Sequence, residues 1–154
     1  MLPEGILNLT SISVADPASS KKRILEQAAQ LLVPAGGEPA AEQIFERLLE
    51  RERLGSTGLA GGVALPHARI PGISTSHGAF LRLNEAVEFD ALDGQPVDLV
   101  FALLVPEDAT EEHLQLLGQL ATMFNQPELR EELRSAEAKQ AFAILTGNST
   151  THAA

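Results

Sequence analysis

The chain has 154 residues, of which 44% are hydrophobic and 21% charged, with a formal net charge of −10 and no cysteine. This length suits one domain with its own core, and the missing cysteines exclude disulfides and thiolate chemistry. The negative charge disfavours nucleic acid, whose phosphates would be repelled, and suits a basic protein partner. The first residues, MLPEGILNLT, lack a signal-peptide pattern and no apolar run reaches bilayer length, so we expect a cytoplasmic protein without membrane insertion.

Two helices are predicted in the first third of the chain. Ser19 or Ser20 can cap a helix whose apolar residues recur at helical spacing, namely Ile24, Leu25, Ala28, Leu31 and Leu32. Pro39 is then expected to be the first residue of a second amphipathic helix, roughly residues 39 to 53. Gly55 is expected to end that helix in a left-handed conformation.

The middle of the chain predicts strands, and its last third predicts helices. The segments GVALP (62–66), HGAFLRL (77–83) and VDLVFALLVP (97–106) are typical of buried strands, with a turn at Asp93-Gly94. Thr110 can cap a third helix, EEHLQLLGQLATMF (111–124), and two shorter helical segments follow at 127–135 and 136–145. The pattern predicts a single-domain α/β sandwich over residues 1–146, with helices at both ends of the chain around a central sheet, and a disordered tail over 147–154.

Two basic side chains lie close to buried helix faces. An α-helix turns by about 100° per residue. On that spacing, Arg51 is rotated about the helix axis by roughly 70° from the centre of the apolar face. It is either an arginine with its stem along the core edge or a functional group. His113 lies within roughly 15° of the apolar centre of the third helix, in its first turn. It is either a hydrogen-bonded core histidine or a group placed where the helix dipole favours an anion.

The segment around His67 combines a strand end with a glycine-rich loop. His67 follows the predicted strand GVALP, and ligands gather at the carboxyl ends of strands in open α/β sheets. Upstream, Gly55, Gly58, Gly61 and Gly62 could offer N–H groups to an oxyanion, and Ser56 and Thr57 add hydroxyls. A surface loop before a capping histidine fits the same residues, and GSTGLAGG is not a Walker motif because it has no lysine.

Metal and hydrolase chemistry fit the sequence poorly. The nine residues between His67 and His77 match no short metal-ligand spacing. No serine lies in a nucleophile-elbow context. We therefore expect no metal and no cofactor, and interpret His77 and His152 as a strand residue and a tail residue.

The segments LERERLGSTGLAGGVALPHARI and FDALDGQPVDLVFALLVPEDATEEHLQLLGQLATMF resemble the enzyme IIA domains of the phosphoenolpyruvate-dependent phosphotransferase system. The similarity is to the fructose/mannitol/nitrogen group, closest to its nitrogen-regulatory branch, and runs to about Leu145. It implies a mixed central sheet flanked by helices. It also implies a phosphoryl carrier without autonomous turnover of a small substrate.

The resemblance implies a role for each candidate residue. His67 would accept the phosphoryl group on Nε2, His113 would hydrogen-bond the phosphoryl oxygens and Arg51 would bind them, with Ser56 and Thr57 in the phosphoryl-binding loop. The donor would be an HPr- or NPr-type carrier, docking on an apolar face for which Leu59, Ala60 and Ile70 are candidates.

Three functions stay open at the level of the sequence. In the nitrogen-regulatory function, the phosphorylation state of His67 controls binding to targets, for instance a transporter or a sensor kinase. In the sugar-transport alternative, the phosphoryl group passes to a IIB component. A binding module without transfer is the third, and the intact set of His67, His113 and Arg51 argues against it.

Overall fold

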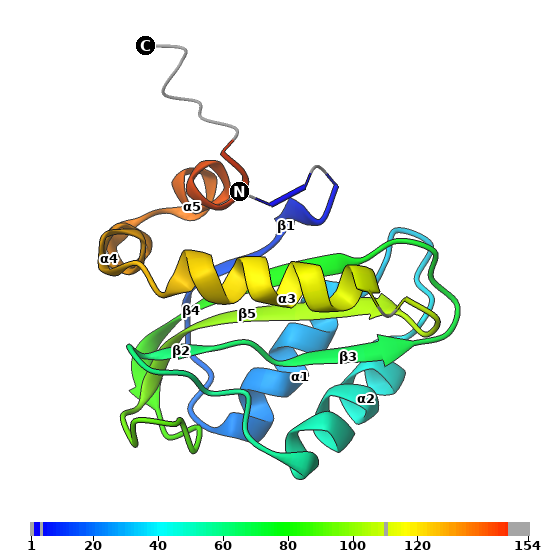
Figure 1. The fold of residues 1–154 in the computed structure, drawn as a ribbon, viewed down its shortest axis with the longest axis horizontal. Helices are drawn as coiled ribbons and strands as arrows, with labels where there is room; N and C mark the ends of the chain where they lie inside the picture. The colour runs from blue at the N-terminus through cyan, green and yellow to red at the C-terminus, as the bar shows by residue number, and fades with distance from the viewer. Residues whose placement is uncertain (1, 4, 110, 148–154) are drawn as a thin grey trace.

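A mixed five-stranded sheet forms the centre of the fold (Figure 1). This computed structural model describes residues 2, 3, 5–109 and 111–147, without the side chains of residues 112 and 113. The strands are β1 (Leu7–Asp16), β2 (Val63–Ala64), β3 (His67–Ile70), β4 (His77–Val87) and β5 (Val97–Pro106). The helices are α1 (Lys21–Leu32), α2 (Ala41–Leu54), α3 (Glu111–Phe124), α4 (Pro127–Ser135) and α5 (Ala138–Thr146).

The sheet has the order β1-β4-β5-β2, and β3 continues the β2 edge along β5. β4 and β5 pair antiparallel, whereas β1 runs parallel to β4 and both β2 and β3 run parallel to β5. The predicted turn at Asp93-Gly94 lies between β4 and β5, where the Gly94 N–H donates to Ala91 O at 2.9 Å. The mixed sheet flanked by helices is therefore confirmed.

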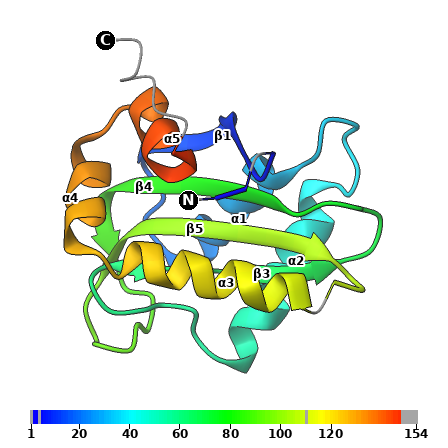
Figure 2. The same ribbon diagram turned by 45° about the horizontal axis from the view of Figure 1, so that its top comes forward.

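The sheet separates two hydrophobic cores. In β5, Val100, Ala102 and Leu104 pack on the side of α1 and α2, while Leu99, Phe101 and Leu103 pack on the side of α3 to α5. This alternation follows from the two-residue period of a strand, and burial on both faces explains why the segment is apolar almost throughout. Figures 1 and 2 show α3 over one face of the sheet, with α1 and α2 on the other.

The sequence missed the first element of the chain. β1 occupies Leu7–Asp16. The expectation that both ends of the chain are helical was therefore wrong. Two register shifts against β4 interrupt the pairing of this edge strand, and three consecutive residues, 8–10, are exposed. The period-two pattern that marks a half-buried strand is lost for that reason.

The helix ends were predicted in part. Ser20 caps α1 by accepting from the Arg23 N–H at 3.1 Å, as expected. Pro39 is not the first helical residue, because α2 begins at Ala41 after Ala40 as its cap. Gly55 does end α2, but at φ 160° and ψ 145° it is extended and not left-handed. The last helix begins at Ala138, two residues later than expected.

None of the helices within the described ranges is both long and apolar enough to cross a bilayer. Gly147 ends α5 in a left-handed conformation. The proposed helix cap Thr110 and the tail from residue 148, including His152, lie outside the described residues. The disordered tail therefore stays a prediction.

Candidate functional site at the edge of the sheet

His67 lies at the start of the edge strand β3. β2 has only two residues, so His67 opens a strand and does not directly follow one, as the sequence had suggested. Its backbone pairs with that of Leu103 in β5, whereas the next residue, Ala68, pairs with Leu104. Leu103 packs in the core beneath α3, so this register places position 67 on the α3 face of the sheet.

A backbone hydrogen bond fixes the tautomer of the His67 ring. Nδ1 lies 2.8 Å from the carbonyl oxygen of Leu65, which can only accept. Nδ1 therefore carries the hydrogen, and Nε2 bears the lone pair when the ring is neutral. Burial holds the pKa of His67 below its ordinary value of 6.5. The Leu65 hydrogen bond raises the pKa, Arg51 lowers it and Glu52 raises it, each less than burial does.

Arg51 and His67 line the same pocket, which has a volume of 390 Å³. The other residues that line it are Arg47, Glu50, Leu54, Ala68 and Arg69. Arg51 is half-buried, and its Nη1 donates to Gly55 O at 2.8 Å, which orients the guanidinium from the last turn of α2. The structure thus brings together two residues that the sequence singled out separately, in a pocket with three arginines and one glutamate.

Ser56 and Thr57 lie in the loop after α2, and neither lines this pocket. The Ser56 hydroxyl donates to Phe89 O at 2.6 Å and accepts from the Gly58 N–H at 3.0 Å. The Thr57 hydroxyl donates to the Glu52 carboxylate, and Thr57 is 5% exposed. In this conformation both hydroxyls bind protein acceptors, and their contact with a phosphoryl group stays a prediction.

Four glycine N–H groups were expected to be available to an oxyanion. For three of them this expectation is wrong. The N–H groups of Gly55, Gly58 and Gly61 donate to Glu52 O, Ser56 Oγ and Asp93 Oδ2 respectively. These bonds shape the loop internally, so those donors do not face a ligand. Gly61 and Gly62 have φ of +83° and +80°, which explains why this turn requires glycine.

His113, which is predicted to assist His67, lies in the first turn of α3. This helix covers the face of the sheet to which the register of β3 assigns position 67. Its side chain lies outside the described part of the chain, so its orientation stays a prediction. Buried Leu116 and Leu120 follow it by about one and two turns, in agreement with the predicted inner face. Leu114, which the sequence had counted with that face, is 68% exposed.

Sequence reasoning missed two residues of this site. Glu52 is 7% exposed and contacts the loop, and its spacing was a usable signal, since Ile44, Leu48 and Glu52 lie on one helical face and all three are buried. Leu54 lines the pocket and is 85% exposed, so it offers apolar surface beside His67.

Ile70 is fully buried in the core and cannot contribute to a docking face, contrary to expectation. Ala60 is exposed and Leu59 half-buried.

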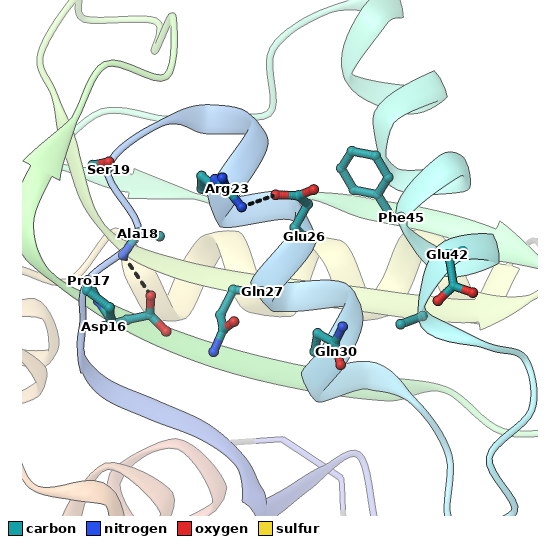
Figure 3. A pocket seen from close by; sticks show the side chains of 11 residues that line it. Asp16, Pro17, Ala18, Ser19, Arg23, Glu26, Gln27, Gln30, Glu42 and Phe45 are labelled. Atoms are coloured by element: carbon teal, nitrogen blue, oxygen red, sulfur yellow. Dashed lines mark hydrogen bonds and ion pairs between the residues drawn. The ribbon is translucent and has the colours of Figure 1, made fainter.

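A separate pocket of 520 Å³ lies between α1 and α2 (Figure 3). Its polar lining includes the exposed Arg23–Glu26 ion pair, Gln27 and Gln30, with the Phe45 ring at one side. It contains none of the candidate site residues. The chemistry suggested by the sequence therefore belongs to the smaller pocket at the β3 edge.

Metal-ligand chemistry has no cluster to support it in the part of the chain that the structure describes. No group of three or more histidine, aspartate and glutamate side chains there could hold a metal ion. His77 opens β4 as a half-buried strand residue, and burial lowers its pKa.

The chain matches known proteins over most of its length. Residues 5–147 match the family model described as "Phosphoenolpyruvate-dependent sugar phosphotransferase system, EIIA 2". The nitrogen regulatory protein of Pseudomonas aeruginosa is 53% identical over 138 residues, which cover 90% of each chain. A fructose-specific EIIA component of Haloferax volcanii is 37% identical over 135 residues, covering 88% of each chain.

Among solved structures, nitrogen regulatory protein IIA-Ntr from Neisseria meningitidis superimposes with a TM-score of 0.84 at 48% identity. The match covers 91% of this chain and 96% of that one. The resemblance seen in the sequence, including its preference for the nitrogen-regulatory branch, is therefore confirmed. The chain belongs to the EIIA 2 family of the phosphoenolpyruvate-dependent phosphotransferase system.

Proposed function

We propose that this protein is a cytoplasmic phosphohistidine carrier of the nitrogen branch of the phosphotransferase system. It accepts a phosphoryl group on Nε2 of His67 from an HPr- or NPr-type protein. The observation that carries the proposal is the Nδ1 bond of His67 to Leu65 O, in a ring that lines a pocket with Arg51. That bond directs the lone pair of the neutral ring to Nε2, the nitrogen that must attack.

The transfer step is an exchange between two imidazoles. Nε2 of neutral His67 attacks the phosphorus of the donor phosphohistidine, and the donor N–P bond breaks with its electron pair left on the donor ring. Each ring keeps the hydrogen on its other nitrogen, so no proton has to move. Catalysis then rests on positioning and on cations that meet the phosphoryl oxygens.

We propose Arg51 for that role, since it lines the pocket with His67 and acts on the charge of its ring. Its guanidinium can donate two directional, charge-assisted hydrogen bonds to phosphoryl oxygens. We propose that His113, in the first turn of α3, adds a further donor. The two residues would then approach the phosphoryl group from opposite layers of the sandwich. Ser56 and Thr57 would hold the loop after α2 in its conformation through their hydrogen bonds within the protein.

Regulation follows from the charge that the step adds. Phosphorylation brings nearly two negative charges to a protein whose net charge is already −10. Target proteins that contact the β3 edge, such as a transporter or a sensor kinase, would distinguish the two states by that change. The exposed Leu54 supplies apolar surface beside the site for the same contacts.

Intact-mass analysis tests the proposal directly. The protein is incubated with enzyme I, an HPr-type carrier and phosphoenolpyruvate, beside His67→Ala. An acid-labile gain of one phosphoryl group in the wild type, absent from the variant, is the expected result. A wild type that gains no mass with a competent donor would refute transfer and leave a binding module.

The sugar-transport function is the second candidate, favoured by the similarity to the fructose-specific component of Haloferax volcanii. In that case the phosphorylated protein would pass its group to a IIB component. Adding a fructose- or mannitol-type IIB protein to the phosphorylated chain separates the two functions. Rapid, complete loss of the phosphoryl group to IIB supports the sugar pathway, and retention supports the regulatory one.

A further inference from the structure

The pocket at the β3 edge is rich in positive charge for so acidic a chain. The whole sequence has 11 lysines and arginines against 21 aspartates and glutamates. Beside His67, the charged residues that line the pocket are Arg47, Arg51 and Arg69 against Glu50 alone. Among the lining residues, positive charge is therefore in excess, and it favours an anion in a chain that otherwise repels one.

Arg47 lies one turn before Arg51 on α2. Residues four apart in a helix lie on the same face, about 6 Å from one another along the axis. The side chains of both arginines are half-buried, and both line the pocket that contains His67. Neighbouring turns of one helix thus bring two guanidinium groups to the same cavity.

The two arginines are held in different ways. Nη1 of Arg51 donates to Gly55 O at 2.8 Å, a bond that orients its guanidinium. Nη1 of Arg47 lies 3.7 Å from Oε2 of Glu107, which is too far for a hydrogen bond. The Arg47 side chain is 37% exposed and that of Glu107 is 59% exposed, so water screens their attraction. Arg47 can therefore leave Glu107 for a stronger anion at little cost.

Phosphorylation of His67 would bring such an anion into the same pocket. A phosphoryl group carries nearly two negative charges and three acceptor oxygens, whereas the Glu107 carboxylate carries one charge. A single guanidinium donates two parallel hydrogen bonds to such a group, so Arg51 leaves acceptor sites for a second cation. The attraction on Arg47 would then be greater from the phosphoryl oxygens than from Glu107.

We propose that Arg47 is a second phosphoryl-binding residue. It pairs with Glu107 in the unphosphorylated protein and turns to the phosphoryl oxygens when His67 carries them. The inference rests on the proposed function of His67. Glu107 directly follows β5 and is exposed, so the exchange also leaves an unpaired carboxylate at the surface, which a target protein can detect.

Three variants and a control test the exchange. Arg47→Gln removes the guanidinium and keeps a polar side chain. Glu107→Gln removes the competing carboxylate and so releases Arg47 to the phosphoryl group. The double variant shows whether Glu107 acts through Arg47. Arg53→Gln is the matched control, because Arg53 is an exposed arginine of the same helix that does not line the pocket.

The measurements are the equilibrium constant for transfer from a phosphorylated HPr-type donor and the ³¹P NMR titration of the phosphohistidine, assigned by its absence from His67→Ala. Arg47→Gln should shift the equilibrium away from the phosphorylated protein by about threefold to tenfold. It should also raise the pKa of the phosphoryl group, since one cation fewer stabilises the dianion. Glu107→Gln should move both quantities in the opposite direction, but neither in the Arg47→Gln background. Arg53→Gln should leave both at their wild-type values.

The inference is overturned if Arg47→Gln matches Arg53→Gln in both measurements. It is also overturned if the effect of Glu107→Gln is absent from the single variant or persists in the double variant. Glu107→Gln changes an exposed side chain, so the direction of its effect still decides if Arg47→Gln does not fold.

The failure of the proposed function is a separate outcome. A wild type that gains no phosphoryl group from a competent carrier refutes that function. The same titration on protein phosphorylated chemically with phosphoramidate then still decides the role of Arg47. If His67 takes up no phosphoryl group from either source, both proposals are overturned.

Discussion

Arg51 and His67 line one pocket although they belong to opposite sides of the sheet. Arg51 comes from α2, which packs on one face, and the register of β3 directs position 67 to the face covered by α3. Both can line it because β3 forms the edge of the sheet within the described residues, so the two faces adjoin there. A histidine on the α3 face of a central strand could not line a pocket together with a residue of α2.

Replacement of Arg51 by alanine should slow phosphoryl transfer to His67 by roughly a hundredfold, the usual cost of losing one preorganised donor to transferred charge. The measurement is a single-turnover assay with a phosphorylated HPr-type donor. Arg53→Ala is the control, because Arg53 is an exposed arginine in the same last turn of α2. Equal rates for the two variants would show that Arg51 does not contact the phosphoryl group.

The pH dependence of transfer should follow the lowered pKa of His67. A protonated ring has no lone pair, so the rate falls when the ring takes up a proton. Since burial holds the pKa below 6.5, the neutral form persists to lower pH than in a free histidine. The rate should therefore be flat from about pH 8 to the ordinary histidine value and fall only below it. NMR titration of the ring provides the check, and a midpoint above 6.5 would contradict the prediction.

The sequence predicted the elements whose burial pattern is simple. β5 is apolar on both faces, and α3 and α4 have the predicted boundaries, because their periodicity is set by the core that they touch. β1 was missed since its bulged pairing breaks the alternation, and Gly55 was assigned the wrong conformation since its backbone is extended. The bulges of β1 depend on its pairing with β4, which lies about 70 residues later in the chain according to the strand bounds.

The same limit applies to the site. The family pattern identified His67, although the residue opens β3 and does not follow the end of a strand as expected. Helical geometry marked Arg51 as bordering a buried face. Glu52 was overlooked because a glutamate in an amphipathic helix is normally exposed. Its burial depends on Thr57 and on Lys21, which belongs to a different helix.

Arg134 should stabilise the glycine turn that leads to β2. Its guanidinium binds both carboxylate oxygens of Asp98, at 2.9 and 3.0 Å, and donates to Gly61 O at 2.7 Å. Arg134→Ala should lower the free energy of unfolding by about 1–3 kcal/mol, since it leaves a partly buried carboxylate and a carbonyl without this donor. Urea unfolding measures the loss, with Arg53→Ala as the exposed control. A loss below about 0.5 kcal/mol, the range of ordinary surface changes, would show that Arg134 does not stabilise this turn.

Gly58 should be intolerant of any side chain. A Cβ there would lie 2.8 Å from the Ala91 Cα, and backbone cannot give way as a flexible side chain does. Gly58→Ala should therefore cost about 1–3 kcal/mol in stability, as overpacking does. It should also slow transfer, because the loop that carries Ser56 and Thr57 must shift.

Gly118→Ala is the opposite case and the control for this substitution. Gly118 is exposed in the interior of α3, and a Cβ there meets nothing within 4 Å. Alanine at a helix interior position should stabilise the protein by about 0.5–1 kcal/mol. Thermal or urea unfolding of both variants is the measurement. If Gly58→Ala is as stable as the wild type, the loop is not packed against Ala91 in solution.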